Sequence, residues 1–268
     1  MASKDLSTPF TLYSSTYSIC AIMVQMTYEL RGSPPEGRPD MKIDRKIIDI
    51  SHKGREQLSE FYLLNVNPEG VVPVLVNDKV LGKPMPESVD ISLYIADWYP
   101  SLLPSRHKQV IEELLDELHQ ISYKLLTFGT QTTFPTTSVA WLREQSQRPD
   151  ISDAYRKALK YKESKISVWA DNHSEEDLAE AENRTRAFCA KIVALMEKRP
   201  DEKDKLTYIF GPEPTVLDAH VLPFLGRVYE KERLYLLPPT LVEWHKQFRE
   251  TDLWKRAVPA GTTLPPFA

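Results

Sequence analysis

The sequence is short of cysteine, of glycine and of long apolar runs. Its 268 residues include two cysteines, Cys20 and Cys189, which are too few for a disulfide framework or a four-cysteine zinc site. Only nine residues are glycine, and no GxGxxG or GxxxxGK[ST] motif occurs, which argues against a phosphate-cradling nucleotide site. GxSxG and HExxH motifs are missing too. We therefore expect neither a nucleotide cofactor nor a metal.

An excess of positive charge and a membrane-spanning segment are also lacking. The 34 basic and 38 acidic side chains give a net charge of −4, so no nucleic-acid partner is indicated. No apolar run approaches the roughly 20 residues that cross a bilayer, and the first ten residues lack the apolar core of a secretory signal. These features predict a cytoplasmic globular protein with no membrane partner.

The first hundred residues show β and α signals in alternation. The predicted elements, in chain order, are a strand over 10–13, a helix over 19–30, a strand over 46–50, a short helix, strands over 71–76 and 79–81 around a turn, and a helix over 88–98. We expect the short helix to bury Leu58, Phe61, Tyr62 and Leu64 on its apolar side. This order predicts a compact α/β unit.

The remaining residues show helical periodicity alone. Apolar residues recur at helical spacing over 110–118, 166–172, 188–196, 216–229 and 241–254. The change of pattern predicts two domains, an α/β domain over residues 1–103 and an all-α domain over residues 104–268.

Pro73 interrupts an otherwise apolar strand. A proline removes a ladder donor, so it sits at an edge, at a strand start or at a cis bend. If the Val72–Pro73 bond is cis, the Val72 amide and carbonyl face outward and can pair with the backbone of a bound peptide. An ordinary edge-strand proline is the alternative.

Glu87 and Ser88 precede the helix over 88–98. A serine at a helix start can offer its hydroxyl and the free amides of the first turn to a carboxylate. A neighbouring glutamate can hold an ammonium group. The pair suits the α-amino acid end of a γ-glutamyl peptide, although simple capping of the helix by Ser88 would explain the serine equally well.

Three stretches together carry a family resemblance. Residues 65–75 (NVNPEGVVPVL) and 86–91 (PESVDI) resemble the two glutathione-site signatures of cytosolic glutathione transferases. Residues 208–220 (YIFGPEPTVLDAH) resemble the C-terminal motif of that family, in which Thr215 caps a buried helix and Asp218 reaches back to the Thr215 amide. The resemblance implies a thioredoxin-like N-terminal domain, an all-helical C-terminal domain, glutathione as the bound cofactor, and a homodimer.

The resemblance also implies roles for individual residues. Val72, before Pro73, would hold the cysteinyl backbone of glutathione, and Glu87 with Ser88 the γ-glutamyl end. Gln57 falls near the position that binds the glycine carboxylate, and His52 and Lys53 are rivals for that role.

The catalytic hydroxyl is expected just after the first strand. Lowering the pKa of a thiol by about two units takes roughly 2.7 kcal/mol of preferential thiolate stabilisation, which a hydroxyl donor and a helix N-terminus can supply in large part. Ser18 corresponds to the serine of theta-like and zeta-like members, with Ser15 and Tyr17 as alternatives.

Residues 18–20 (SIC) resemble the zeta pattern Ser-Ser-Cys, with Ile19 in the middle. Cys20 matches the cysteine of that pattern or is a small core residue, and the basic residue that follows in the family is replaced by residues 21–23 (AIM). Tyr17, His119 and Tyr123 are expected to line the substrate pocket, with His119 and Tyr123 on one long helix.

Three functions follow from the resemblance. The first is transfer of glutathione to a hydrophobic electrophilic small molecule. The second is glutathione-dependent cis–trans isomerisation of a conjugated alkene, for which the divergent residues suggest a substrate from specialised metabolism. The third is a non-enzymatic interaction module, and a disulfide or dehydroascorbate reductase acting through Cys20 is a further alternative.

Overall fold

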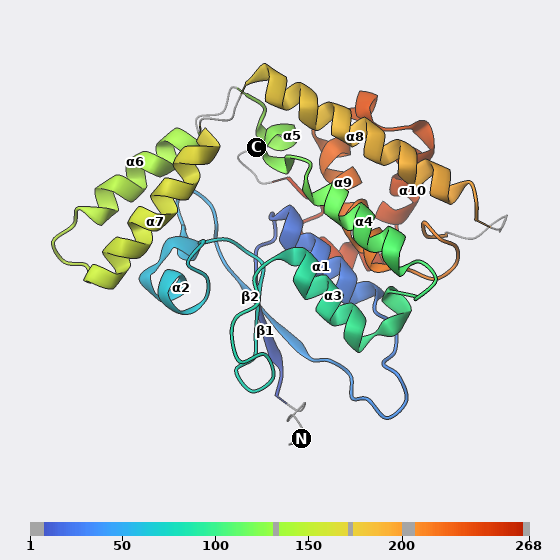
Figure 1. The fold of residues 1–268 in the computed structure, drawn as a ribbon, viewed down its shortest axis with the longest axis horizontal. Coiled ribbons are helices and arrows are strands. Elements are labelled where there is room, and N and C mark those ends of the chain that lie inside the picture. The colour runs from blue at the N-terminus through green and yellow to red at the C-terminus, as the bar shows by residue number, and fades with distance from the viewer. Residues whose placement is uncertain (1–7, 131–133, 171–173, 200–206, 265–268) are drawn as a thin grey trace.

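The computed structural model describes residues 8–130, 134–170, 174–199 and 207–264 (Figure 1). The N-terminal part contains β1 (Phe10–Ser14), α1 (Ile19–Leu30), β2 (Ile43–Ile47), η1 (Glu56–Leu58), α2 (Glu60–Asn65), β3 (Val74–Val76), α3 (Ser88–Trp98) and η2 (Pro100–Leu102). The helical part contains α4 (Lys108–His119), α5 (Tyr123–Phe128), α6 (Phe134–Ser146), α7 (Asp153–Ala170), α8 (Glu175–Met196), α9 (Val216–Glu230), η3 (Leu234–Leu236), α10 (Pro239–Arg249) and α11 (Asp252–Ala257).

The strands form one sheet in the order β2-β1-β3. β1 runs parallel to β2 and antiparallel to β3, with Leu12 opposite both Arg45 and Leu75. The parallel pair is connected through α1, as a parallel crossover requires. α1 also packs on α3, where the Thr27 hydroxyl is 3.0 Å from the Ser92 hydroxyl. This half has the mixed α/β order expected from the sequence.

The expected strand over residues 79–81 does not form. The Asn77 side chain accepts the amides of Lys79 and Val80 at 3.1 and 3.0 Å, and the Asn77 carbonyl accepts the amide of Leu81 at 2.8 Å. These bonds close the chain into turns. The return segment pairs with β3 only at Met85, which forms an isolated bridge with Leu75.

Two further details of the N-terminal half differ from the sequence-based expectation. β2 covers residues 43–47 instead of 46–50, because the chain leaves the sheet at Asp49, whose carboxylate accepts the Ser51 amide at 2.8 Å. α2 buries Tyr62 and Leu63 and leaves Phe61 and Leu64 exposed, since the helix begins only after Ser59, which caps it. Of the four residues expected on its apolar side, Tyr62 and the preceding Leu58 of η1 are buried, and Phe61 and Leu64 are not.

The helical half is built around α9, which is buried along almost its whole length. At its start, Asp218 accepts hydrogen bonds from the amides of Thr215 and Ile209, at 2.8 and 2.7 Å, and from the Thr215 hydroxyl at 2.7 Å. This confirms the expected capping box. Burial raises the pKa of Asp218 to about 6, with these hydrogen bonds opposing the shift.

Two helices of the helical half end where a side chain caps the next helix. Residues 241–254, expected as one helix, form α10 and α11, because the Thr251 hydroxyl accepts the Trp254 amide at 3.1 Å. His119 and Tyr123, expected on one helix, lie on α4 and α5, because Ser122 caps α5 through the Leu125 amide at 3.3 Å. Residues 166–170 belong to α7, and residues 171–172 lie outside the described residues.

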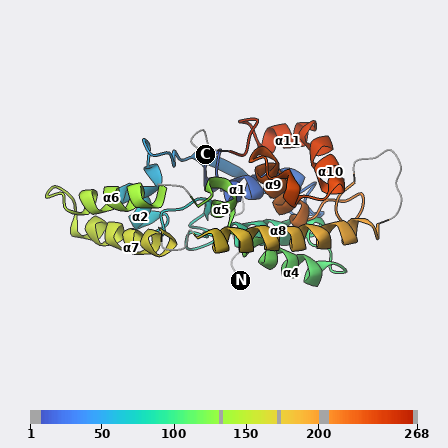
Figure 2. The same cartoon turned by 90° about the horizontal axis from the view of Figure 1, so that it is seen from above.

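The α6–α7 hairpin lies apart from the other helices of the helical half and packs on α2 of the N-terminal half (Figures 1 and 2). Leu142 and Leu159 of the hairpin form a small core with Leu58 and Leu63, and the Tyr155 hydroxyl donates to the Leu58 carbonyl at 2.7 Å. The hairpin therefore attaches to the N-terminal half.

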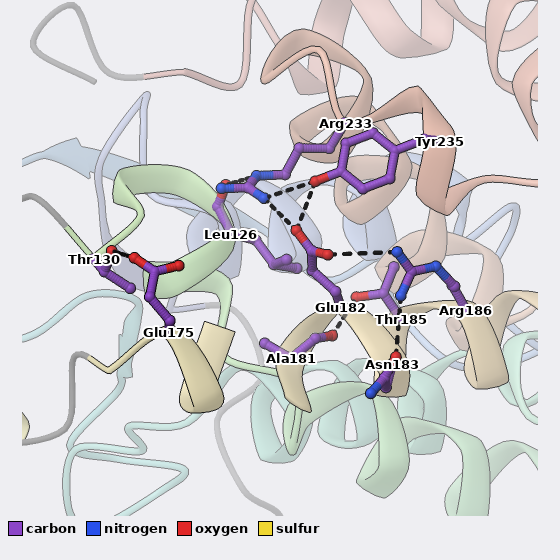
Figure 3. A network of polar contacts seen from close by, with 10 residues as sticks. All are labelled: Leu126, Thr130, Glu175, Ala181, Glu182, Asn183, Thr185, Arg186, Arg233 and Tyr235. Carbon is purple, nitrogen blue, oxygen red and sulfur yellow. Dashed lines mark hydrogen bonds and ion pairs between the residues drawn. The ribbon is translucent and has the colours of Figure 1, made fainter. Parts of the chain in front are cut away.

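A network of ionic and polar contacts joins α5 to α8 and η3 (Figure 3). Arg233 donates to the Leu126 carbonyl at 3.0 Å and to the Glu182 carboxylate at 2.6 Å, and the Tyr235 hydroxyl donates to the same carboxylate at 2.6 Å. Glu182 and Arg233 are largely buried, so this network ties α5 to α8 and η3 more firmly than an exposed ion pair would. None of the helices in the described residues is long and apolar enough to span a membrane.

Replacement of Asp218 by alanine should lower the free energy of unfolding by about 3 kcal/mol, because three buried donors lose their acceptor. Urea denaturation measures this difference. Asp97→Ala, at an exposed carboxylate, is the control and should change the free energy by less than about 0.5 kcal/mol. Equal losses in the two variants would show that the capping box does not stabilise α9.

Candidate functional site

A cavity of about 420 Å³ lies between the sheet and the helical half. Eleven of the residues singled out from the sequence line it, and these are Tyr17, Ser18, Cys20, His52, Gln57, Val72, Pro73, Glu87, Ser88, His119 and Tyr123. Two do not. Ser15 is buried beside the cavity, and Lys53 is exposed. The candidate site is therefore a single pocket to which both halves of the chain contribute.

Val72 lies at the edge of this cavity with its backbone unpaired. The Val72–Pro73 bond is cis, and the Val72 amide and carbonyl make no hydrogen bond with the described residues. The preceding carbonyl, of Val71, is held by the Tyr62 hydroxyl at 2.8 Å and the Asn67 side-chain amide at 3.2 Å. One donor and one acceptor thus remain available to a ligand backbone.

Glu87 and Ser88 form the entry to α3. Glu87 adopts a φ of +69°, a conformation that residues other than glycine rarely adopt and that is concentrated at binding sites. Ser88, expected to cap the helix, is instead its first residue and is buried, and no side chain caps α3. The first-turn amides therefore have no acceptor in the described part of the chain, as an anion site at a helix N-terminus requires.

Ser18 caps α1, and its hydroxyl oxygen accepts the Ala21 amide at 3.4 Å. The hydroxyl hydrogen remains available for donation into the cavity. Of the two alternatives, Tyr17 also lines the cavity and Ser15 does not. Their main-chain carbonyls hold the loop before α1, where that of Ser15 accepts the Ser18 amide at 3.3 Å and that of Tyr17 accepts from the Arg227 guanidinium at 3.0 Å. Of the two serines, only Ser18 faces the cavity.

Cys20, two residues after Ser18 in the first turn of α1, also lines the cavity. Burial raises the pKa of the Cys20 thiol, and the Ser88 hydroxyl, Arg227 and Lys124 oppose that shift. Positive charge therefore reaches this thiol from Lys124 of α5 and Arg227 of α9, and not from positions 21–23. A raised pKa disfavours Cys20 as a nucleophile.

His119 is the cavity end of a chain of buried hydrogen bonds. Its Nε2 lies 2.9 Å from Nδ1 of His220, whose Nε2 lies 2.9 Å from the Ser92 hydroxyl. Burial lowers the pKa of His119 to about 4, so its imidazole is neutral at physiological pH. The neighbouring Tyr123 donates its hydroxyl to the Leu118 carbonyl at 2.9 Å and offers mainly its ring to the cavity.

Several lining residues had no signal in the sequence. Among them are Arg55, Lys124, Thr127, Lys162 and Arg227, which come from elements far apart along the chain. No local motif surrounds them, and only the packing of the α6–α7 hairpin, α5 and α9 brings them together. Within the described ranges, no group of three or more His, Cys, Asp or Glu side chains could hold a metal ion.

No protein-family model matches the chain, and no curated protein matches it in sequence. Solved structures do. A bacterial maleyl pyruvate isomerase, a zeta-class glutathione transferase, has a TM-score of 0.54 at 18% identity, with 96% of this chain and 99% of that chain covered. The theta-class enzyme of Xanthomonas axonopodis pv. citri with glutathione bound has a TM-score of 0.55 at 16% identity, with 94% of this chain and 98% of that chain covered. Ure2p in complex with glutathione has a TM-score of 0.58 at 14% identity, with 93% of this chain and 98% of that chain covered.

These likenesses extend over nearly the whole of each chain. The protein therefore has the glutathione transferase fold, with a thioredoxin-like N-terminal part and a helical C-terminal part. At these identities the likeness defines the fold, which confirms the fold class predicted from the sequence.

Cys20 should react slowly with iodoacetamide near neutral pH, more slowly than free glutathione does. Its raised pKa leaves less thiolate at that pH, and the rate should climb as the pH rises towards that pKa. The Cys189→Ala background isolates the signal, because Cys189 is fully buried. Rapid alkylation with a midpoint below pH 7 would contradict this assignment and favour a reductase acting through Cys20.

Proposed function

We propose that this protein binds glutathione in the cavity and transfers its thiolate to a hydrophobic electrophilic small molecule. The observation that carries the proposal is one pocket that combines the unpaired Val72 backbone, the uncapped start of α3 and the Ser18 hydroxyl. The bound glutathione in the theta-class enzyme and in Ure2p, which share the fold, supports the same reading.

Each part of the tripeptide has a chemically matched partner. The Val72 amide and carbonyl pair with the cysteinyl backbone in the manner of a short β-ladder. Glu87 holds the γ-glutamyl ammonium group, and the Ser88 hydroxyl with the α3 amides holds the adjacent carboxylate. Gln57 faces the glycine end, and His52 lies beside it in the lining.

Ser18 donates a hydrogen bond to the thiolate and so lowers the pKa of the bound thiol. The charges of Lys124 and Arg227, which act on the Cys20 thiol nearby, favour a negative sulfur in the same way. The thiol proton leaves to solvent, the sulfur forms a bond to an electrophilic carbon, and the displaced electron pair leaves with a leaving group or is protonated. Tyr17, His119 and Tyr123 line the side of the cavity available to the electrophile.

The isomerase alternative uses the same site. Thiolate adds reversibly to a conjugated alkene, the former double bond rotates, and elimination returns the thiol unchanged. The fold shared with a bacterial maleyl pyruvate isomerase supports this second candidate. Mass balance distinguishes the two, since an isomerised product without an adduct identifies an isomerase. A non-enzymatic interaction module is the outcome in which glutathione does not bind.

Replacement of Ser18 by alanine should reduce turnover about 10- to 100-fold at saturating glutathione, because a hydrogen bond to a charged group is lost. Glutathione affinity, measured by calorimetry, should change less than about threefold, since the peptide contacts remain. Ser15→Ala, at the buried serine outside the cavity lining, is the matched control and should retain full turnover. Full activity of Ser18→Ala would remove Ser18 from the catalytic role.

We also propose that the protein is a cytoplasmic homodimer. Four large apolar side chains on β2, α2 and the loop after it are 41–55% exposed, and they are Ile47, Phe61, Leu64 and Val71. Such a group of exposed apolar residues is typical of an interface.

Phe61→Glu should therefore shift the protein from dimer to monomer in light scattering coupled to size exclusion. Leu234→Glu, at a leucine on η3 that is 42% exposed, should leave the dimer intact. A wild-type monomer at every concentration tested, or dissociation by Leu234→Glu alone, would contradict this placement of the interface.

A further inference from the structure

The cavity concentrates positive charge in a chain whose net charge is −4. Its lining includes the cationic residues Arg55, Lys124, Lys162 and Arg227, whereas Glu87 is the only acidic residue among the described residues that line it. Glu87 is matched to an ammonium group in the proposed function. Four cationic side chains and one carboxylate thus stand among the described residues of the lining, a balance of charge that favours an anionic ligand.

Lys162, on α7, is the most buried of the lysines in this lining, with 9% of its surface exposed. Its Nζ donates to the Glu69 carbonyl, and it forms no ion pair with a described residue. The Glu69 carboxylate is directed elsewhere, to the Tyr161 hydroxyl and, at 3.8 Å, to Lys165. Burial and the charge of Lys124 lower the pKa of Lys162 to about 8, although the charge of Glu69 opposes that shift. A buried ammonium group that forms no ion pair with a described residue is unfavourable, and an anionic ligand relieves that cost.

Arg55 is held in place by the same hairpin. Its guanidinium lies over the ring of Trp141, on α6, at 4.5 Å from the centroid, and it makes no hydrogen bond with the described residues. Its backbone adopts a φ of +48°, which is uncommon outside glycine. The guanidinium is thus positioned by stacking while its donors stay available for a carboxylate.

Both cations lie at one end of the peptide-binding edge. Lys162 holds the carbonyl of Glu69, three residues before Val72, and Arg55 is two residues before Gln57. Glu87 and Ser88 belong to the other end, because Met85 just before them pairs with Leu75 after Pro73. A tripeptide that pairs with Val72 and points its amino end to α3 directs its terminal carboxylate towards Gly70, Lys162 and Arg55.

We propose that Lys162 and Arg55 form a carboxylate subsite that holds the glycine end of glutathione. The proposal rests on the proposed function and assigns part of the peptide site to the α6–α7 hairpin. Lys162 and Arg55 then take the role that the resemblance offered to Lys53, which lies outside the cavity, and His52 and Gln57 make secondary contacts with the glycine end. The hairpin then serves recognition of a free C-terminal carboxylate, in addition to covering α2.

Calorimetric titration with S-methylglutathione and with its glycine ethyl ester tests this subsite. The methyl group removes the titrating thiol, and the ester removes only the carboxylate charge. Wild-type protein should bind the acid about tenfold or more tightly than the ester, because a charge-assisted pair is lost in the ester. Lys162→Met and Arg55→Gln should each weaken binding of the acid by a similar factor and change binding of the ester less than about twofold.

Lys165→Met, at an exposed lysine on the same helix, should bind both probes as the wild type does. Equal affinity of the wild type for acid and ester, or equal losses for both probes in Lys162→Met, would overturn the subsite and assign these cations to the second substrate or to stability. Binding of neither probe by the wild type would overturn the proposed function as well, so the two failures are distinguishable.

Discussion

One buried guanidinium holds together the walls of the cavity. Arg227, on α9, is 5% exposed and donates to the carbonyl of Tyr17, to the hydroxyl of Thr127 on α5, and to Thr263 near the C-terminal end of the described chain. Burial lowers its pKa to about 10, so it stays cationic at physiological pH. The loop before α1, the helix that bears Tyr123 and the core helix therefore take their relative positions from one charged side chain. Removal of a buried guanidinium with several hydrogen bonds leaves its acceptors unsatisfied.

Because Arg227 fixes these elements, the two halves of the chain, which differ in architecture, can line one pocket with different groups. The N-terminal half supplies backbone groups, at Val72 and at the start of α3, which a sheet edge and a helix end provide without special side chains. The helical half supplies charge and apolar surface. Lys124 and Arg227 act on the Cys20 thiol, and the α6–α7 hairpin brings Lys162 to the Glu69 carbonyl.

The sequence was informative where a local pattern determines local structure. Val72–Pro73, Glu87–Ser88 and the Thr215–Asp218 capping box each depend on neighbours within a few residues, and the structure has the expected cis bond and capping box. The sequence misled where a single polar side chain redirects the backbone. Asn77 closes turns instead of a hairpin strand, and Ser122 separates α4 from α5. Arg55 and Lys162 could not be found from the sequence, because 106 positions separate them and only the packing of the hairpin on α2 makes them neighbours of one cavity.

We propose that a tripeptide lies along Val72 with its sulfur at Ser18, and a crystal structure of the protein with S-methylglutathione can decide this. We expect a pair of hydrogen bonds between the cysteinyl backbone and the Val72 amide and carbonyl, the sulfur beside the Ser18 hydroxyl, and the glycine carboxylate between Arg55 and Lys162. A ligand bound elsewhere, or a sulfur placed against Cys20 with Val72 unpaired, would show that the tripeptide does not bind in this way.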